Sequence, residues 1–216
     1  NNIDLSVVSS VTDASGNVVA ELWQLVAPPT GTFNVVVTRA GSARMAAGAL
    51  SLTGVDQTTP IEATNNATAN SSTPSVSVTT VSNNAWVLDV LAFRREDAGA
   101  GSVPTGTPGA GQTERWSAYV DSGTTTSDIR NKGSTKGPIT AAGAVTMSWT
   151  LSNAAEWAHF AASIKPAADG GTTLSSAANQ TFTVGQASTT ASTLTVTESS
   201  TPTITTLNDI RIRIPA

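Results

Sequence analysis

The chain has no cysteine and a single histidine, His159, in 216 residues. The lack of cysteine excludes disulfide bonds, thiol catalysis and thiolate metal sites. A lone histidine excludes a multi-histidine metal site, and a Ser-His-Asp triad could be built only around His159. We therefore expect no cofactor and no metal, and we interpret His159 as a hydrogen-bonded residue within a strand.

Charge is scarce as well. Charged residues make up 12% of the chain, the net charge is −4, and the 11 Lys and Arg do not form a basic cluster. Nucleic acid is therefore not an expected partner. No apolar run approaches the roughly 20 residues that cross a bilayer, and no charged-then-apolar signal segment opens the sequence. The sequence predicts no membrane span.

Threonine and serine are abundant instead, at 35 and 25 residues. Threonine is β-branched and suits a half-wet pleated surface, which favours strands over helices. We predict an all-β fold, a two-sheet antiparallel β-sandwich of jelly-roll type with a C-terminal β-strand extension. The threonine-rich, lysine-poor composition favours an extracellular, bacterial setting.

The stretch 22–39, LWQLVAPPTGTFNVVVTR, predicts a hairpin around which the fold is organised. Pro28 and Pro29 stop one strand, and Gly31 permits the reversal into the next. Residues 3–11 predict a preceding half-buried strand, and residues 46–53 predict a following strand in which Gly48 marks a close approach.

Further strands are expected farther along the chain. Residues 85–93 are apolar on both faces, which predicts a central strand. Its only charged residue, Asp89, is either a buried, hydrogen-bonded carboxylate or part of a bulge turned to water. Residues 114–120 and 143–151 predict two more strands. Residues 153–165 fit helical and strand periodicity equally, and the all-β context favours a strand.

Polar stretches separate these strands. Residues 54–75, 94–112 and 121–138 predict surface loops. The turn at 13–17, DASGN, predicts either a plain Asx turn or a calcium-binding loop, although the glutamate of an EF-hand is missing. The expected core includes the following side chains: Trp23, Val35, Val37, Trp86, Leu88, Trp149 and Leu151.

Candidate catalytic residues are few. Glycoside hydrolysis needs two carboxylates across a groove, and the carboxylates nearest strands are Asp89, Glu114 and Glu156. Nothing in their spacing pairs them, and we predict that the protein is not an enzyme. The five tryptophans could stack on sugar rings or pack in the core. They are Trp23, Trp86, Trp116, Trp149 and Trp157.

Residues 8–168 resemble a jelly-roll, concanavalin-like β-sandwich module that recurs in large secreted and surface proteins of bacteria. The resemblance rests on SVTDASGNVVAELWQLVAPPTGTFNVVVT, GALSLTGVDQTTPIEA and ASIKPA. In that module one or two further strands precede the part that begins this sequence. The resemblance implies a role in adhesion, architecture or carbohydrate contact, with one sheet edge missing.

The C-terminal part resembles the start of a second bacterial surface-protein repeat, through ANQTFTVGQAS and NDIRIRIPA. We expect a β-sandwich domain at 1–167, a linker at 168–173 and an incomplete β extension at 174–216. About 45 residues without disulfide or metal rarely form a core of their own. The extension is therefore expected to pack on its own sandwich or on a neighbouring one.

These features favour a structural subunit of an extracellular fibre or surface layer that polymerises with copies of itself by lending a strand. The proposed assembly strand places Ile210, Ile212 and Ile214 on one face and Arg211 and Arg213 on the other. The alternative lender is the N-terminal strand with Ile3, Leu5 and Val7. Two other functions stay open: a carbohydrate-binding or adhesive module that contacts surface glycans, and a glycoside hydrolase-like enzyme.

Overall fold

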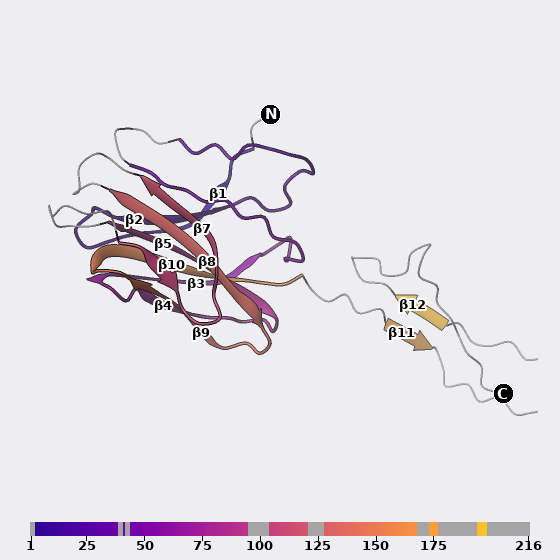
Figure 1. Ribbon diagram of the computed structural model, residues 1–216. Helices are drawn as coiled ribbons and strands as arrows, with labels where there is room; N and C mark the ends of the chain where they lie inside the picture. Colours follow the sequence, from indigo (N-terminus) through magenta and orange to yellow (C-terminus); the bar gives the residue numbers. More distant parts are fainter. Residues whose placement is uncertain are drawn as a thin grey trace, which may run out of the picture. The chain divides into compact units, whose positions relative to one another are not determined.

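The computed structural model describes residues 3–38, 41, 44–94, 104–120, 128–167, 173–176 and 194–197. The chain divides into two compact units, residues 1–167 and 168–216. Every regular element in the described residues is a β-strand, so none of them forms a helix that could cross a membrane (Figure 1). The structure thus confirms the predicted all-β, antiparallel sandwich.

A five-stranded antiparallel sheet forms the centre of the first unit (Figure 1). Its strands, in spatial order, are β3 (Ile61–Ser71), β10 (Ala155–Ile164), β5 (Ala85–Arg94), β8 (Ile129–Ile139) and β7 (Thr113–Val120). β5 is the middle strand, as predicted. β10 is buried along its whole length, because both faces of the sheet are covered.

A three-stranded sheet covers one face. It consists of β4 (Ser75–Thr79), β9 (Ala144–Leu151) and β6 (Gly106–Pro108), in the order β4-β9-β6. The alternating pattern of β9 holds, with its apolar side chains facing the central sheet: Val145, Met147, Trp149 and Leu151. They pack on central residues that include Leu91, Phe93 and Ala161.

A hairpin of β1 (Ser6–Thr12) and β2 (Val19–Gln24) covers the opposite face. Val11, Val18 and Ala20 pack on apolar residues of β5 and β10. A β-bulge between Val7 and Ser9 shifts the alternation, so Val11 points inward whereas Val7 is exposed. Burial of Val7 together with Ile3, expected from the alternation, is therefore wrong.

The predicted hairpin at 22–39 is not formed. β2 ends at Gln24, residues 31–38 lie outside any strand, and all of them are exposed. Residues 46–53 likewise contain no strand. The β propensity of a residue reflects how well its side chain packs against neighbouring strands of a sheet. A segment with alternating apolar residues but no partner strand is therefore extended without forming a hydrogen-bonded ladder.

Three of the expected core residues are consequently exposed: Trp23, Val35 and Val37. Trp86 is half-buried, and the other three, Leu88, Trp149 and Leu151, are buried as expected.

Two stretches predicted as loops contain the longest strands of the central sheet. β3 lies within 54–75, all of β8 except its last residue, Ile139, lies within 121–138, and the short β6 lies within 94–112. β3 is an edge strand whose Asn and Thr side chains remain partly wet. β8 buries polar side chains, among them Asn131 and Ser134, because each of them finds a hydrogen-bond partner. β10 confirms the strand predicted at 153–165.

The second unit contains β11 (Thr173–Ser176) paired antiparallel with β12 (Leu194–Thr197). The proposed assembly strand, Ile210 to Ile214, lies outside the described residues.

Trp116 is held between two glycines. A Cβ added to Gly48 would lie 2.3 Å from the indole ring, and one added to Gly133 would lie 2.0 Å from it. The close approach predicted at Gly48 is therefore present, although no strand carries it. The indole Nε1 donates a hydrogen bond to Asn131 at 2.6 Å, which fixes the ring in this slot.

Gly133→Ala is expected to lower the free energy of unfolding by about 1–3 kcal/mol, because an added methyl group in a closely packed site forces side chains off their rotamers. Urea denaturation of the two proteins measures the difference. Gly143→Ala is the matched control, since a Cβ there has no atom within 4 Å. Equal stability losses in the two variants would contradict the proposed packing of Trp116.

Candidate functional site

Asp89, at the middle of β5, is a buried carboxylate with four hydrogen-bond contacts. Its Oδ1 accepts hydrogen bonds from the backbone N and the Oγ of Ser134, both at 2.7 Å. Its Oδ2 accepts one from Trp149 Nε1 at 2.7 Å and lies 2.9 Å from His159 Nε2. Asp89 and His159 are both fully buried. Asp89 is thus the buried, hydrogen-bonded carboxylate, and not a bulge turned to water.

This network connects the two main sheets. Asp89, Ser134 and His159 come from three strands of the central sheet, and Trp149 comes from β9 of the three-stranded sheet. No substrate can contact Asp89 or His159, because neither side chain reaches solvent. The arrangement fixes how the two sheets meet, and it carries no exposed nucleophile.

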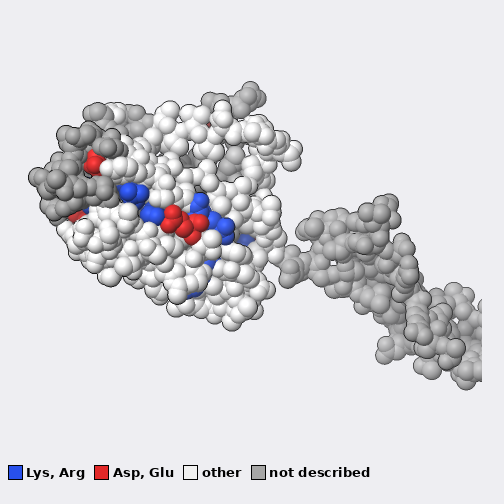
Figure 2. All heavy atoms as spheres, viewed as in Figure 1, with Lys and Arg blue, Asp and Glu red and all other residues white. Residues whose placement is uncertain are grey.

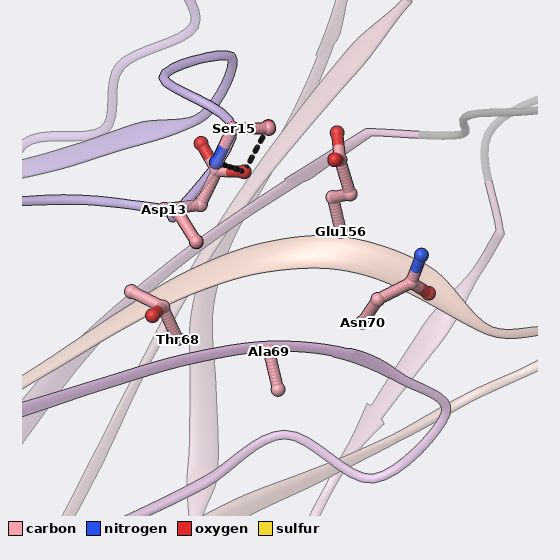
Figure 3. A pocket seen from close by; sticks show the side chains of 7 residues that line it. Asp13, Ser15, Thr68, Ala69, Asn70 and Glu156 are labelled. Atoms are coloured by element: carbon pink, nitrogen blue, oxygen red, sulfur yellow. Dashed lines mark hydrogen bonds between the residues drawn. The ribbon is translucent and has the colours of Figure 1, made fainter.

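Glu156 lies on the other side of β10 from His159, since neighbouring residues of a strand alternate between faces. It lines a pocket of about 230 Å³ between the turn that joins β1 to β2 and the strands β3 and β10 (Figure 3). Asp13 and Ser15 come from the turn, and Thr68, Ala69 and Asn70 come from β3. The pocket therefore brings two carboxylates, Asp13 and Glu156, into one hollow.

The side chain of Asp13 stabilises the turn between β1 and β2. Its carboxylate accepts hydrogen bonds from Ser15 N and Oγ, from Asn17 N at 2.8 Å and from Val18 N at 2.7 Å. Burial, the largest single influence, raises the pKa of Asp13, but the hydrogen bonds from Ser15, Val18 and Asn17 together lower the pKa below its usual 3.8. Asp13 is thus ionised and cannot serve as a general acid near neutral pH.

The same contacts favour the plain Asx turn over a calcium loop. Among the described residues, no group of three or more His, Cys, Asp and Glu side chains is arranged to hold a metal ion. The oxygens of Asp13 already accept hydrogen bonds from the turn, which is the arrangement of an Asx turn.

Asp13→Ala is expected to lower the free energy of unfolding at pH 7 by about 1–3 kcal/mol, because buried backbone donors lose their acceptor. A carboxyl group whose folded pKa is depressed contributes stability above its unfolded pKa, near 3.8, and this contribution is lost as the pH falls through the folded pKa. Denaturation at pH 7 and pH 3 should therefore show a smaller difference between the variant and the parent at pH 3. A difference that stays constant would contradict the role of the ionised carboxylate.

The predicted carboxylates do not converge. Glu156 Oε2 pairs with Arg94 Nε at 2.5 Å, whereas Glu114 Oε2 pairs with Lys132 Nζ at 2.8 Å on β7 and β8. Figure 2 shows the few charged side chains of the viewed face gathered in a line over these two strands. Glu114, Asp89 and Glu156 thus lie in three different environments. Asp89 lies next to the predicted His159, and Glu156 shares its pocket with Asp13.

The tryptophans separate into core and surface. Trp149 and Trp157 are buried, and Trp86 and Trp116 are half-buried. Trp23 is 49% exposed on the outer face of the hairpin, where it lies opposite Val7 in the ladder. Trp23 is thus the tryptophan best placed to stack on a sugar ring.

Exposed apolar side chains are concentrated near the N-terminus. Of the fourteen large hydrophobic residues exposed in the described part of the chain, twelve lie between Ile3 and Leu52. We call this set the N-terminal apolar surface: Ile3, Val7, Val19, Trp23, Leu25, Phe33, Val35, Val36, Val37, Met45, Leu50 and Leu52. Scattered apolar residues are normal on a protein surface, whereas a contiguous apolar patch marks an interaction site. This set is the candidate for such a patch.

Comparisons of the chain with protein-family models, with curated proteins and with solved structures find no match.

The backbone around the N-terminal apolar surface is also unpaired. Within the described residues β1 and β2 pair only with each other, so each leaves its outer edge without a ladder partner. Residues 31–38 make no backbone hydrogen bond to other described residues. Unpaired backbone beside apolar side chains is suited to accept a β-strand. The N-terminal apolar surface is therefore the candidate functional site. Sequence reasoning had assigned Trp23, Val35 and Val37 of this surface to the core.

Proposed function

We propose that this protein is a structural subunit of an extracellular bacterial assembly, a fibre or surface layer, in which copies polymerise by strand exchange. The N-terminal apolar surface with its unpaired backbone is the observation that carries the proposal. Composition and the resemblance to a module of bacterial surface proteins support the extracellular location.

The energetics favour a lasting contact. Burying one valine or isoleucine side chain contributes about 1.5–3 kcal/mol before ordering costs are subtracted. A lent strand that covers several members of the surface therefore contributes enough for stable association. Because lending a terminal strand is a heterologous contact, copies propagate into a fibre unless the rotation closes a ring.

The fold argues for the C-terminal segment as the lender. β1 already pairs with β2 and packs through Val11 on the central sheet of its own unit. Withdrawing it would expose that core. Ile210, Ile212 and Ile214 with the intervening Arg211 and Arg213 form the remaining alternating segment.

The test compares the intact protein with a variant that lacks residues 209–216, by electron microscopy and light scattering. We expect filaments or sheets from the intact protein and monomers from the truncated one. Deleting residues 1–9 removes part of β1 and is expected to destabilise the fold itself. A monomeric intact protein at high concentration, or identical fibres after truncation at 209–216, would refute the proposal.

A second candidate function is glycan binding, and the exposed ring of Trp23 is the observation that favours it. A glycan array tests it, with Trp23→Ala as the variant expected to lose binding. Binding that survives Trp23→Ala would place any glycan site elsewhere.

The third candidate, a glycoside hydrolase, is not favoured, because the oxygens of Asp13 accept hydrogen bonds from its own turn and Glu156 Oε2 pairs with Arg94, so both carboxylates of the pocket already have structural partners. We expect no turnover of polysaccharide or ester substrates. If the protein does hydrolyse such a substrate, and Glu114→Ala or Glu156→Ala abolishes that activity, the proposed structural role is overturned.

A further inference from the structure

We propose that residues 31–38 of one copy are the acceptor for the strand 210–214 of a second copy. This inference rests on the proposed function and names the surface at which the two copies meet. The acceptor is the sequence GTFNVVVT, and the lent strand is IRIRI.

Residues 31–38 form no backbone hydrogen bond with any other residue that the structure describes. Val35, Val36 and Val37 are 57%, 73% and 50% exposed. Consecutive residues of an extended chain point to opposite faces, so both faces of this segment are open to solvent. Val36 is the most exposed large hydrophobic residue of the described chain. The segment thus has the side-chain alternation of a strand, and none of the described residues pairs with it.

Other parts of the surface are better covered. Met45, Leu50 and Leu52 are each exposed by 41% or less, and Gly48 between them lies against the ring of Trp116. The edge strand β3 has a free side too, but it offers Asn and Thr side chains, which provide no apolar contact for an isoleucine strand. Residues 31–38 therefore fit an apolar strand best.

The two segments match in length and pattern. Five or six residues of strand span about 17–20 Å, which the eight residues of the acceptor can accommodate. Ladder hydrogen bonds satisfy both backbones, the isoleucine face covers apolar side chains, and the arginine face stays in water. An isolated pair of strands is marginal in water, so a stable contact also has to bury other members of the N-terminal apolar surface, such as Val7, Val19 and Trp23.

Charge complementarity also favours this occupant. The hairpin and its turn, residues 6–24, carry only two charged side chains, Asp13 and Glu21, and both are acidic. The lent strand carries two positive charges, Arg211 and Arg213, in a chain with a net charge of −4. A basic strand is therefore attracted to the acidic hairpin of a neighbour, whereas Arg39, which directly follows the acceptor in the sequence, opposes this attraction. Both effects weaken as salt is added.

The absence of native cysteine allows a clean cross-linking experiment. Val36→Cys and Ile212→Cys are made as separate single variants, mixed, oxidised and analysed by mass spectrometry of the disulfide-linked peptides. We expect a 36–212 disulfide between two chains. The matched control mixes Val81→Cys with Ile212→Cys, because Val81 is 67% exposed and lies outside the N-terminal apolar surface. The control pair is expected to give at least tenfold less cross-link.

Electron microscopy of the same samples separates the possible outcomes. Filaments together with an interchain 36–212 disulfide support the inference. Filaments without that disulfide, or with equal cross-linking at position 81, overturn the acceptor assignment and leave strand exchange standing. Absence of any assembly by the parent protein overturns the proposed function. A double variant that forms a 36–212 disulfide within one monomer shows that the tail folds back on its own unit, which overturns both.

Discussion

Val36→Lys is expected to abolish assembly and to leave the fold intact. In the single copy Val36 is 73% exposed and belongs to no strand, so the substitution changes the free energy of unfolding by no more than about 0.5 kcal/mol. In the proposed assembly Val36 is part of the ladder with the lent strand, and an ammonium group buried in that contact without a partner costs several kcal/mol.

The measurement is the critical concentration for assembly, followed by light scattering. A loss of about 2.7 kcal/mol corresponds to a hundredfold weaker contact, so we expect the critical concentration to rise at least that much. Urea denaturation checks that the variant is folded.

Val81→Lys is the matched control, because it places the same charge at a similarly exposed valine on the connection between β4 and β5. Its critical concentration should equal that of the parent protein. If Val36→Lys and Val81→Lys assemble equally well, residues 31–38 are not part of the contact.

Asp89→Ala is expected to cause the largest stability loss of any single substitution considered for this protein. It removes the acceptor of Ser134 N and Oγ and of Trp149 Nε1, and it leaves His159 without its carboxylate. Removing one partner from a buried charged network costs about 3–5 kcal/mol, because the groups left behind stay out of water without a hydrogen bond. Thermal and urea denaturation measure the loss.

Glu21→Ala provides the comparison, since Glu21 is an exposed carboxylate whose hydrogen bonds to Ser10 and Trp23 are 3.2 Å long. We expect a change of at most about 1 kcal/mol there. Asp89→Asn keeps the shape of the side chain but replaces one acceptor oxygen with an NH2 donor. Its loss of stability should lie between those of Asp89→Ala and Glu21→Ala. A loss below about 1 kcal/mol for Asp89→Ala would show that the network does not hold the two sheets together.

Local pattern predicted part of the fold correctly. β5 has apolar residues on both faces and β9 alternates cleanly, and both strands lie where the sequence placed them. Such strands can be recognised because the order of apolar and polar residues indicates which faces of the strand are buried. β10 could not be separated from a helix by periodicity, and the all-β composition decided it correctly.

Polar strands escaped the same reasoning. β3 and β8 contain many Asn, Thr, Lys and Gly residues, so the sequence suggested loops. Their strand structure depends on partners distant in the chain: β3 pairs with β10, and β8 pairs with β5 and β7. Hydrogen bonds to those partners, and not hydrophobicity, make these segments strands.

By itself the sequence determined the all-β class, the central position of β5 and the expectation that Asp89 is either buried and bonded or turned to water. Only the tertiary structure decided that Asp89 is buried, because its partners Ser134, Trp149 and His159 come from three other strands. Tertiary structure also decided that Val35 and Val37 are exposed. An alternating apolar pattern indicates that one face of a segment is suited to burial. Whether that face is buried depends on which other strands of the chain pack against it.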